Sequence, residues 1–171
     1  VIEISCGVKL PISTSAENGI CIGTLGASPD VKWDGFRMTT DDKNVYLDGN
    51  IPRGTLYAAY DFAEKYLGYR YFADDCEVIP TEGEAEVPCG LDAVDNPVFS
   101  ARRTTCWQHH RSAQFSSLSR LNDCTPGGDE FGGDEPVRHY NKPVCTDTLL
   151  HMMCNHQDRQ IPACPVFHLG G

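Results

Sequence analysis

Apolar and polar residues alternate at the start of the chain, where the even positions from Ile2 to Leu10 are apolar. Alternation with a period of two places one face of a β-strand against a core, so the pattern predicts a strand that ends before Pro11. Further short strands are predicted over 20–23, 31–38 and 44–47. Two Asp-Gly pairs, at 34–35 and 48–49, are typical of a bulge or a hairpin turn. Together these segments predict an antiparallel meander.

A helical pattern follows the last of these strands. Apolar residues recur at helical spacing, as Leu56, Ala59, Tyr60, Ala63 and Leu67. This spacing predicts a helix over 54–67 that buries the stripe.

The ends of this helix are also marked in the sequence. Thr55 is the predicted N-cap and Gly68 the predicted C′ residue. Asp61 and Lys65 are spaced to form an i,i+4 ion pair on the outer side of the helix. Residues 69–72 are then predicted to form a strand.

The order of these elements predicts a small α+β fold. We expect a mostly antiparallel sheet, with mixed pairing as the alternative, and one or two helices packed on a face. Aromatic residues of the helix, such as Tyr57 and Phe62, are expected in the core. An irregular Cys/His-rich segment with partial β/α character follows. We therefore place one domain at 1–95 and a second region at 96–171, with 91–97 as the joining segment.

Composition narrows the classes of function. Among 171 residues, Lys and Arg total 14 and Asp and Glu total 24, which gives a formal net charge of −10. This balance argues against nucleic-acid binding, which needs a basic surface to displace counterions. We find no apolar run near the roughly 20 residues that a membrane-spanning helix requires. The chain is also too short for a complete eight-fold β/α barrel, which takes about 200 residues or more.

Nine cysteines are many for this length, and the number is odd. A secreted or periplasmic protein with disulfide bonds is one interpretation, and a reduced cytoplasmic protein with buried thiols is the alternative. Unpaired strand edges favour association, so a homo-oligomer is also expected.

The run from Arg53 to Phe72 resembles a known unit. It is similar to the helix and strand of the amino-terminal α/β domain that precedes the catalytic barrel in several glycoside hydrolases. These include β-hexosaminidases, α-glucuronidases and related, mostly uncharacterised bacterial proteins. The preceding segments 34–38 and 45–49 match the hairpin of that domain in the right order. Ala58 and Tyr71 depart from the pattern, where the family more often has Gly and Trp.

The resemblance extends beyond the first domain. Residues 96–102 are similar to the opening of the first barrel strand, and Arg102 matches an arginine that binds sugar hydroxyls in β-hexosaminidases. A guanidinium group suits vicinal hydroxyls. Trp107 and His109 lie just beyond and are candidates for the same sugar site, with packing as the alternative role for each.

The resemblance implies a role without catalysis. The chain is expected to be the amino-terminal portion of a carbohydrate-active, glycoside-hydrolase-like protein, inactive alone and supporting a barrel that is mostly absent. Its partner is then a carbohydrate, bound through the parent protein.

An acidic, glycine-rich loop is predicted over 125–136, where Gly-Gly-Asp-Glu occurs twice. Asp134 and Glu135 match the catalytic motif of β-hexosaminidases, but that motif lies on the fourth barrel strand. Only about 30 residues separate them from Arg102, and each β/α unit takes roughly 30 residues. No catalytic residue is therefore assigned, and we interpret the segment as a loop.

Two alternatives to the glycoside-hydrolase interpretation remain. The first is a complete small secreted binding module held together by disulfide bonds. The second is a module stabilised by a zinc ion, since thiolates and imidazole suit tetrahedral Zn²⁺. The candidate zinc ligands are Cys145, Cys154, Cys164 and His168.

Overall fold

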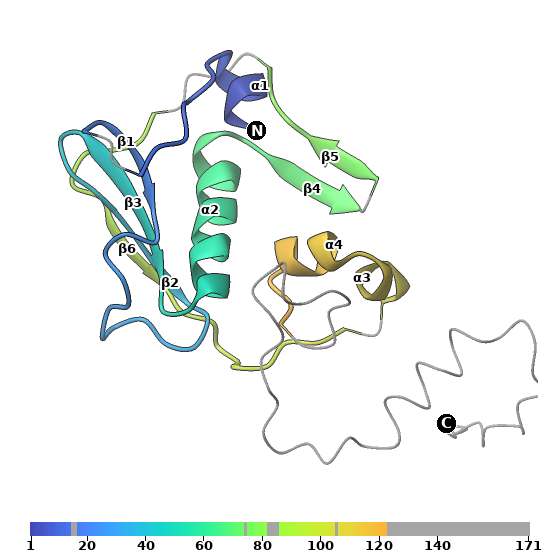
Figure 1. Cartoon of the computed structure of the whole chain (residues 1–171). Coiled ribbons are helices and arrows are strands. Elements are labelled where there is room, and N and C mark those ends of the chain that lie inside the picture. Colours follow the sequence, from blue (N-terminus) through green and yellow to red (C-terminus); the bar gives the residue numbers. More distant parts are fainter. Residues whose placement is uncertain (15–16, 74, 82–85, 105, 123–171) are drawn as a thin grey trace, which may run out of the picture. The chain divides into compact units, whose positions relative to one another are not determined.

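The computed structural model describes residues 1–122 apart from 15–16, 74, 82–85 and 105, all within the first of two units, Val1–Pro136. Its elements are α1 (Ile2–Cys6), β1 (Gly19–Ile22), β2 (Phe36–Thr40), β3 (Asn44–Gly49), α2 (Pro52–Tyr66), β4 (Arg70–Ala73), β5 (Cys76–Val78), β6 (Asp92–Asp95), α3 (Trp107–Arg111) and α4 (Ala113–Leu118). Helix α2 packs against a four-stranded sheet, while β4 and β5 form a separate hairpin (Figure 1). This arrangement confirms the predicted small α+β fold.

The four-stranded sheet is mixed. Its strand order is β1-β3-β2-β6, with β2 antiparallel to both β3 and β6, and β1 parallel to β3. The predicted antiparallel pairing is right for β2 and β3 but wrong for β1, because the chain after β1 passes beyond β3 before it enters the sheet as β2. The predicted joining segment 91–97 supplies the edge strand β6. The Leu91 N–H donates to Thr40 Oγ1 (2.8 Å) where this strand begins.

The strand predicted over residues 2–10 is wrong, because the chain forms helix α1 there. Gly7 ends this helix in the left-handed conformation, with a φ of 68°. Ile2 and Cys6, four residues apart, pack against the core, whereas Ile4 between them is 53% exposed. Positions 2 and 6 share a face in a strand and also in a helix, so alternation over so short a run does not distinguish the two.

Helix α2 confirms the helix predicted over 54–67 and begins two residues earlier, with a proline in its first turn. The residue at its N-cap is Ile51, so the prediction of Thr55 was wrong. Thr55 lies inside the first turn, where its Oγ1 accepts a hydrogen bond from the Gly49 N–H (3.0 Å). Gly68 follows the helix with a φ of 67°, as predicted for C′.

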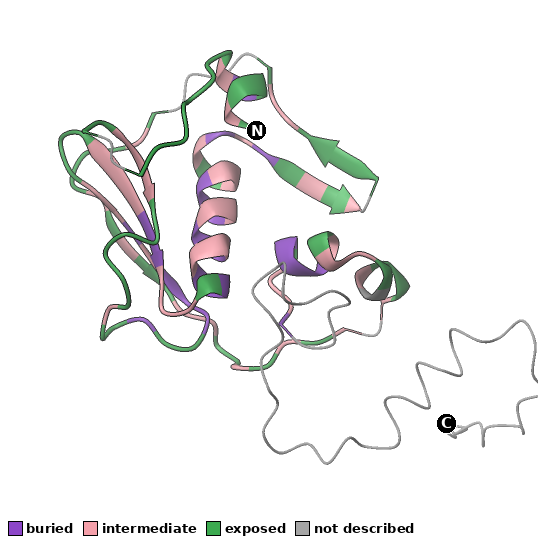
Figure 2. Cartoon of the chain, viewed as in Figure 1, coloured by how far each residue is buried: buried purple, intermediate pink, exposed green. Residues whose placement is uncertain are grey.

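The most buried face of α2 consists of Tyr57, Ala58 and Phe62, at 2%, 0% and 5% exposure. These residues share one apolar core with β2 and β3. Leu67 from the predicted stripe is buried with them, whereas most of that stripe is half-buried beside them. Both the sheet and α4 contact α2, so buried positions lie on more than one side of it (Figure 2). Apolar spacing therefore identifies this helix but not its deepest face.

Two glycines, Gly49 and Gly54, allow the sheet and α2 to approach closely. A Cβ atom at Gly54 would collide with the carbonyl oxygen of Gly35, and one at Gly49 would collide with the backbone of Thr55. The first turn of α2 therefore lies directly on the backbone before β2 and at the end of β3. This approach brings Asp34, the residue before Gly35, beside Arg53 of the helix.

Candidate functional site

A buried carboxylate lies at the centre of the candidate site. Asp34 is 1% exposed and lies two residues before the start of strand β2 at Phe36. Its Oδ2 atom accepts hydrogen bonds from Arg102 Nη2 (2.5 Å) and Asn122 Nδ2 (3.0 Å). The Arg53 guanidinium lies 3.9 Å from the same oxygen. We call Asp34, Arg53, Arg102 and Asn122 the Asp34 cluster.

Asn122 joins the cluster to the backbone of the residues before α3. Its Oδ1 accepts from the Arg102 N–H (2.7 Å), and its Nδ2 also donates to the Ser100 carbonyl (2.6 Å). The Asn122 N–H donates to the Arg102 carbonyl (3.1 Å). Asn122 is 1% exposed. Such a fully bonded, buried amide holds the two ends of residues 102–122 together.

Arg102, the predicted sugar-binding residue, uses its whole guanidinium group within the chain. Its Nε donates to the Arg120 carbonyl (2.7 Å) and its Nη1 to the Phe99 carbonyl (2.8 Å), while Nη2 binds Asp34. The group also lies 6.0 Å from the centre of the Tyr57 ring. These contacts give Arg102 a structural role, and its contact with sugar stays a prediction.

Arg120 forms a second charged contact with α2. Its guanidinium lies 5.4 Å from the Tyr57 ring and 5.7 Å from the Tyr60 ring, within the range of cation–π attraction. It also pairs with Asp61 (3.8 Å) and Glu64 (3.7 Å). Asp61 pairs with Lys65 (2.7 Å) as predicted, but it is only 8% exposed and does not lie on the outer side of the helix.

Tyr57 connects the apolar core to the residues next to Asn122. Its hydroxyl donates to the Leu121 carbonyl (3.0 Å). Burial, and then the nearby Asp34 charge, raise the pKa of Tyr57 to about 12. The phenol therefore stays protonated at neutral pH and acts as a hydrogen-bond donor.

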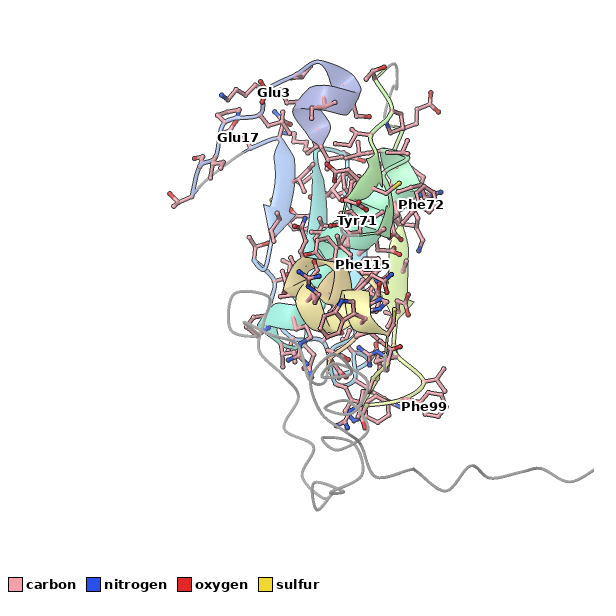
Figure 3. All side chains as sticks on the ribbon, turned by 90° about the vertical axis from the view of Figure 1, so that its right-hand side faces the viewer. Glu3, Glu17, Tyr71, Phe72, Phe99 and Phe115 are labelled. Carbon is pink, nitrogen blue, oxygen red and sulfur yellow. The ribbon has the colours of Figure 1, made fainter. Side chains whose placement is uncertain are left out.

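Trp107 and His109, the other predicted sugar contacts, lie on α3. Trp107 is 49% exposed, with the Arg111 guanidinium 5.5 Å from its ring. The His109 ring stacks on Phe115 at 4.2 Å, and its Nε2 lies 3.0 Å from Ser119 Oγ. Phe115 in turn lies against Tyr71 of β4 at 5.6 Å (Figure 3). Arg102 is engaged with Asp34 and His109 with Phe115, so the contacts of these two residues do not converge on one site.

The described part of 96–102 is not a strand, whereas the resemblance implied the first strand of a barrel. Carbonyl groups of this stretch are bonded by side chains instead. The Ser100 carbonyl accepts from Asn122 and the Phe99 carbonyl accepts from Arg102. These bonds to side chains replace the backbone hydrogen bonds that a strand would make to its neighbour. Two short helices, α3 and α4, follow.

Several predicted residues lie outside the described residues. They are Asp134 and Glu135, the loop 125–136, and the candidate zinc ligands Cys145, Cys154, Cys164 and His168. Within the described part of the chain, no group of three or more His, Cys, Asp or Glu residues is placed to hold a metal ion. The described cysteines are free thiols at Cys6, Cys21, Cys76, Cys89 and Cys106. Across the same residues, we find no helix with the length and apolar character needed to cross a membrane.

No protein-family model matches the sequence, and no curated protein or solved structure matches the chain. The Asp34 cluster is therefore interpreted from its own geometry. Sequence reasoning missed Asp34, Arg53 and Asn122 as members of one site. Asp34 and Asn122 are separated by 88 positions, and no local pattern links two polar residues over that distance.

Proposed function

We propose that this chain is the non-catalytic amino-terminal portion of a carbohydrate-active, glycoside-hydrolase-like protein. Residues 1–95 form its accessory α/β domain. The Asp34 cluster fixes the beginning of the region that follows. In this role the domain binds no substrate itself and holds the next part of the protein in a defined position.

The observation that carries this proposal is the fold of residues 53–72. They form a helix laid over a small sheet, followed by a return strand, in the order that the resemblance requires. The Asp-Gly pair at 34–35 immediately precedes β2, and Gly54 in the first turn of the helix allows a close approach to the Gly35 carbonyl. These features support the accessory-domain interpretation.

The buried carboxylates also support a role without catalysis. Most glycoside hydrolases use two carboxyl groups about 5–10 Å apart, one on each side of the scissile bond. Asp34 is bound to Arg102 and Asn122, and Asp61 is bound to Lys65. Asp48 accepts hydrogen bonds from the Leu25 and Gly26 N–H groups (2.8 and 3.3 Å). Each of the three thus stabilises the fold through contacts of its own.

Two measurements test this proposal. Incubation of the purified chain with chromogenic N-acetylhexosaminides and glucuronides is expected to give no turnover above buffer, with a β-hexosaminidase as the positive control. Turnover that depends on the chain would contradict the non-catalytic role.

The second measurement is the sequence of the gene beyond the codon for Gly171. We expect several hundred further in-frame codons whose products alternate between strand and helix patterns. A stop codon directly after Gly171 in the natural gene would contradict the accessory role. It would favour a complete small module instead.

A further inference from the structure

The described residues of 99–122 are closed into a loop at one oxygen atom, Asp34 Oδ2. Arg102 near its start and Asn122 at its end both donate to Asp34 Oδ2, at 2.5 and 3.0 Å. The two residues also bond to each other through the backbone of Arg102 and the amide of Asn122. Both ends of the loop therefore depend on a single carboxylate that belongs to another part of the fold.

The attachment of this loop to the rest of the domain is mainly polar. Arg120 pairs with Asp61 and Glu64 of α2, and the Tyr57 hydroxyl donates to the Leu121 carbonyl. The stack of Phe115 on Tyr71 adds one aromatic contact. The core cluster, as far as the described residues define it, draws its members from residues 2–91. The loop contributes no member to that cluster, although Ser116, Ser117 and Leu118 of α4 are buried, at 3%, 2% and 7% exposure.

We propose that residues 99–122 are a strap that detaches from Asp34 and unfolds as one unit, while the sheet and α2 stay folded. Opening breaks polar contacts and uncovers Tyr57, while Met38, Leu47 and Phe62 of the core stay packed together. The two bonds to Asp34 Oδ2 are lost together, because Arg102 and Asn122 hold each other in place. Contiguous segments with few apolar contacts open at lower free energy than the core of a domain.

Opening of the strap changes the surface of α2. The Arg120 guanidinium leaves the rings of Tyr57 and Tyr60 and the carboxylates of Asp61 and Glu64. An aromatic and acidic face of the helix is then uncovered. This inference rests on the contacts alone and is independent of any carbohydrate chemistry.

Hydrogen exchange on the whole chain tests the strap. Asn122→Ala removes one of the two donors to Asp34 and changes no charge. We expect hydrogen exchange about 10- to 100-fold faster at the Ser116 and Leu121 amides. The reason is that leaving a buried group without its hydrogen-bond partner costs about 1–3 kcal/mol. The amides of the β2–β3 pair, where Met38 faces Leu47, are expected to change less than about threefold.

Asn96→Ala is the matched control. Asn96 also makes two hydrogen bonds through its side chain, to the Lys32 N–H (2.7 Å) and the Asp30 carbonyl (2.8 Å), but neither involves the strap. We expect this control to leave exchange at the Ser116 and Leu121 amides unchanged. Equal acceleration of strap and core amides in Asn122→Ala would overturn the proposal, as would no acceleration in the strap.

A measurement without substitutions covers the case in which Asn122→Ala does not fold. Exchange of the unaltered chain is followed at increasing urea concentrations below the unfolding transition. Strap amides are expected to open with a lower free energy and a weaker dependence on urea than α2 and β3 amides, because less surface is exposed. Identical free energies and identical urea dependence for all of these amides would contradict a separate opening unit.

Discussion

Two regions of the molecule are stabilised in different ways. One is the layer, formed by the four-stranded sheet and α2, and the other is the strap. In the layer, Met38 and Leu47 of the sheet are 2% and 1% exposed, and they pack in one cluster with Phe62 of the helix. In the strap, Leu118 is buried, but the described contacts with the layer are made mainly by charged or polar residues that bond to specific partners. Apolar packing tolerates small shifts, whereas a buried carboxylate requires its donors in place. The fold of the layer therefore follows from composition and spacing, while the strap depends on a few individual residues.

The largest expected effect comes from the layer. Phe62→Ala is expected to lower the free energy of unfolding by about 3–5 kcal/mol, because it removes a large side chain and leaves a cavity. Phe62 is 5% exposed, and its ring lies 5.4 Å from that of Tyr66. Urea unfolding followed by circular dichroism measures the change. Strap and layer are expected to unfold together in this variant, since the strap has nothing to attach to once α2 melts.

Phe72→Ala is the control for this substitution. Phe72 on β4 is 63% exposed and points away from the domain (Figure 3). Its loss is expected to change the free energy of unfolding by no more than about 0.5 kcal/mol. A comparable loss of unfolding free energy in both variants would contradict the prediction, because it would mean that burial in the apolar core does not decide the effect.

The layer illustrates what the sequence was able to predict. Helix α2, strand β3 and the first residues of β2 were expected from a 3.6-residue period and from the Asp-Gly pairs, because these signals are local. The strand predicted over 31–38 was wrong for residues 31–35, which lie before β2. The parallel pairing of β1 and the addition of β6 were missed, since strand order depends on contacts between distant segments. The helix α1 was missed because a run of five residues with apolar positions at i and i+4 fits both periods.

The strap shows what could not be predicted from the sequence. Arg102 was singled out through a resemblance, yet its partner Asp34 lies 68 positions away and was interpreted only as part of a turn signal. Buried polar residues carry no periodic pattern, so their clustering becomes visible only once the backbone is folded. Arg53 is a similar case, because a charged residue in the first turn of a helix is usually exposed, whereas here it is 2% exposed.

A smaller and more localised effect is expected at Asp34. Asp34→Asn keeps the size of the side chain but removes its charge, and hydrogen bonds to charged groups are worth about 1.5–3 kcal/mol. We expect a loss of stability in this range, with limited proteolysis cutting first within 99–122. Asp92→Asn is the control, because its ion pair with Arg37 (2.6 Å) is exposed to solvent, and exposed pairs contribute little to stability. First cuts within β2 or β3 would contradict a strap held by Asp34.

The smallest expected effect is a pH dependence confined to the layer. Asp41 lies in the turn between β2 and β3, where its carboxylate accepts hydrogen bonds from the Lys43 and Asn44 N–H groups (2.7 and 2.6 Å) and from the Tyr46 hydroxyl (2.9 Å). These bonds, led by that of Lys43, lower the pKa of Asp41 from 3.8 to about 2. Because the folded pKa is lower than the unfolded one, the stabilisation is complete above the unfolded pKa. It is lost as the pH falls from about 4 to about 2.

Carboxyl chemical shifts recorded across this pH range measure the titration of Asp41 directly. We expect a midpoint near 2, as the lowered pKa requires. In Asp41→Asn the turn loses its carboxylate, so this contribution to the pH dependence of unfolding disappears while other acidic groups keep theirs. Strap amides are expected to respond no differently in the variant and the unaltered chain, because Asp41 contacts residues of the β2–β3 turn. A midpoint near 3.8 would show that the turn does not hold the carboxylate, and a strap response would show that the two regions are coupled through the sheet.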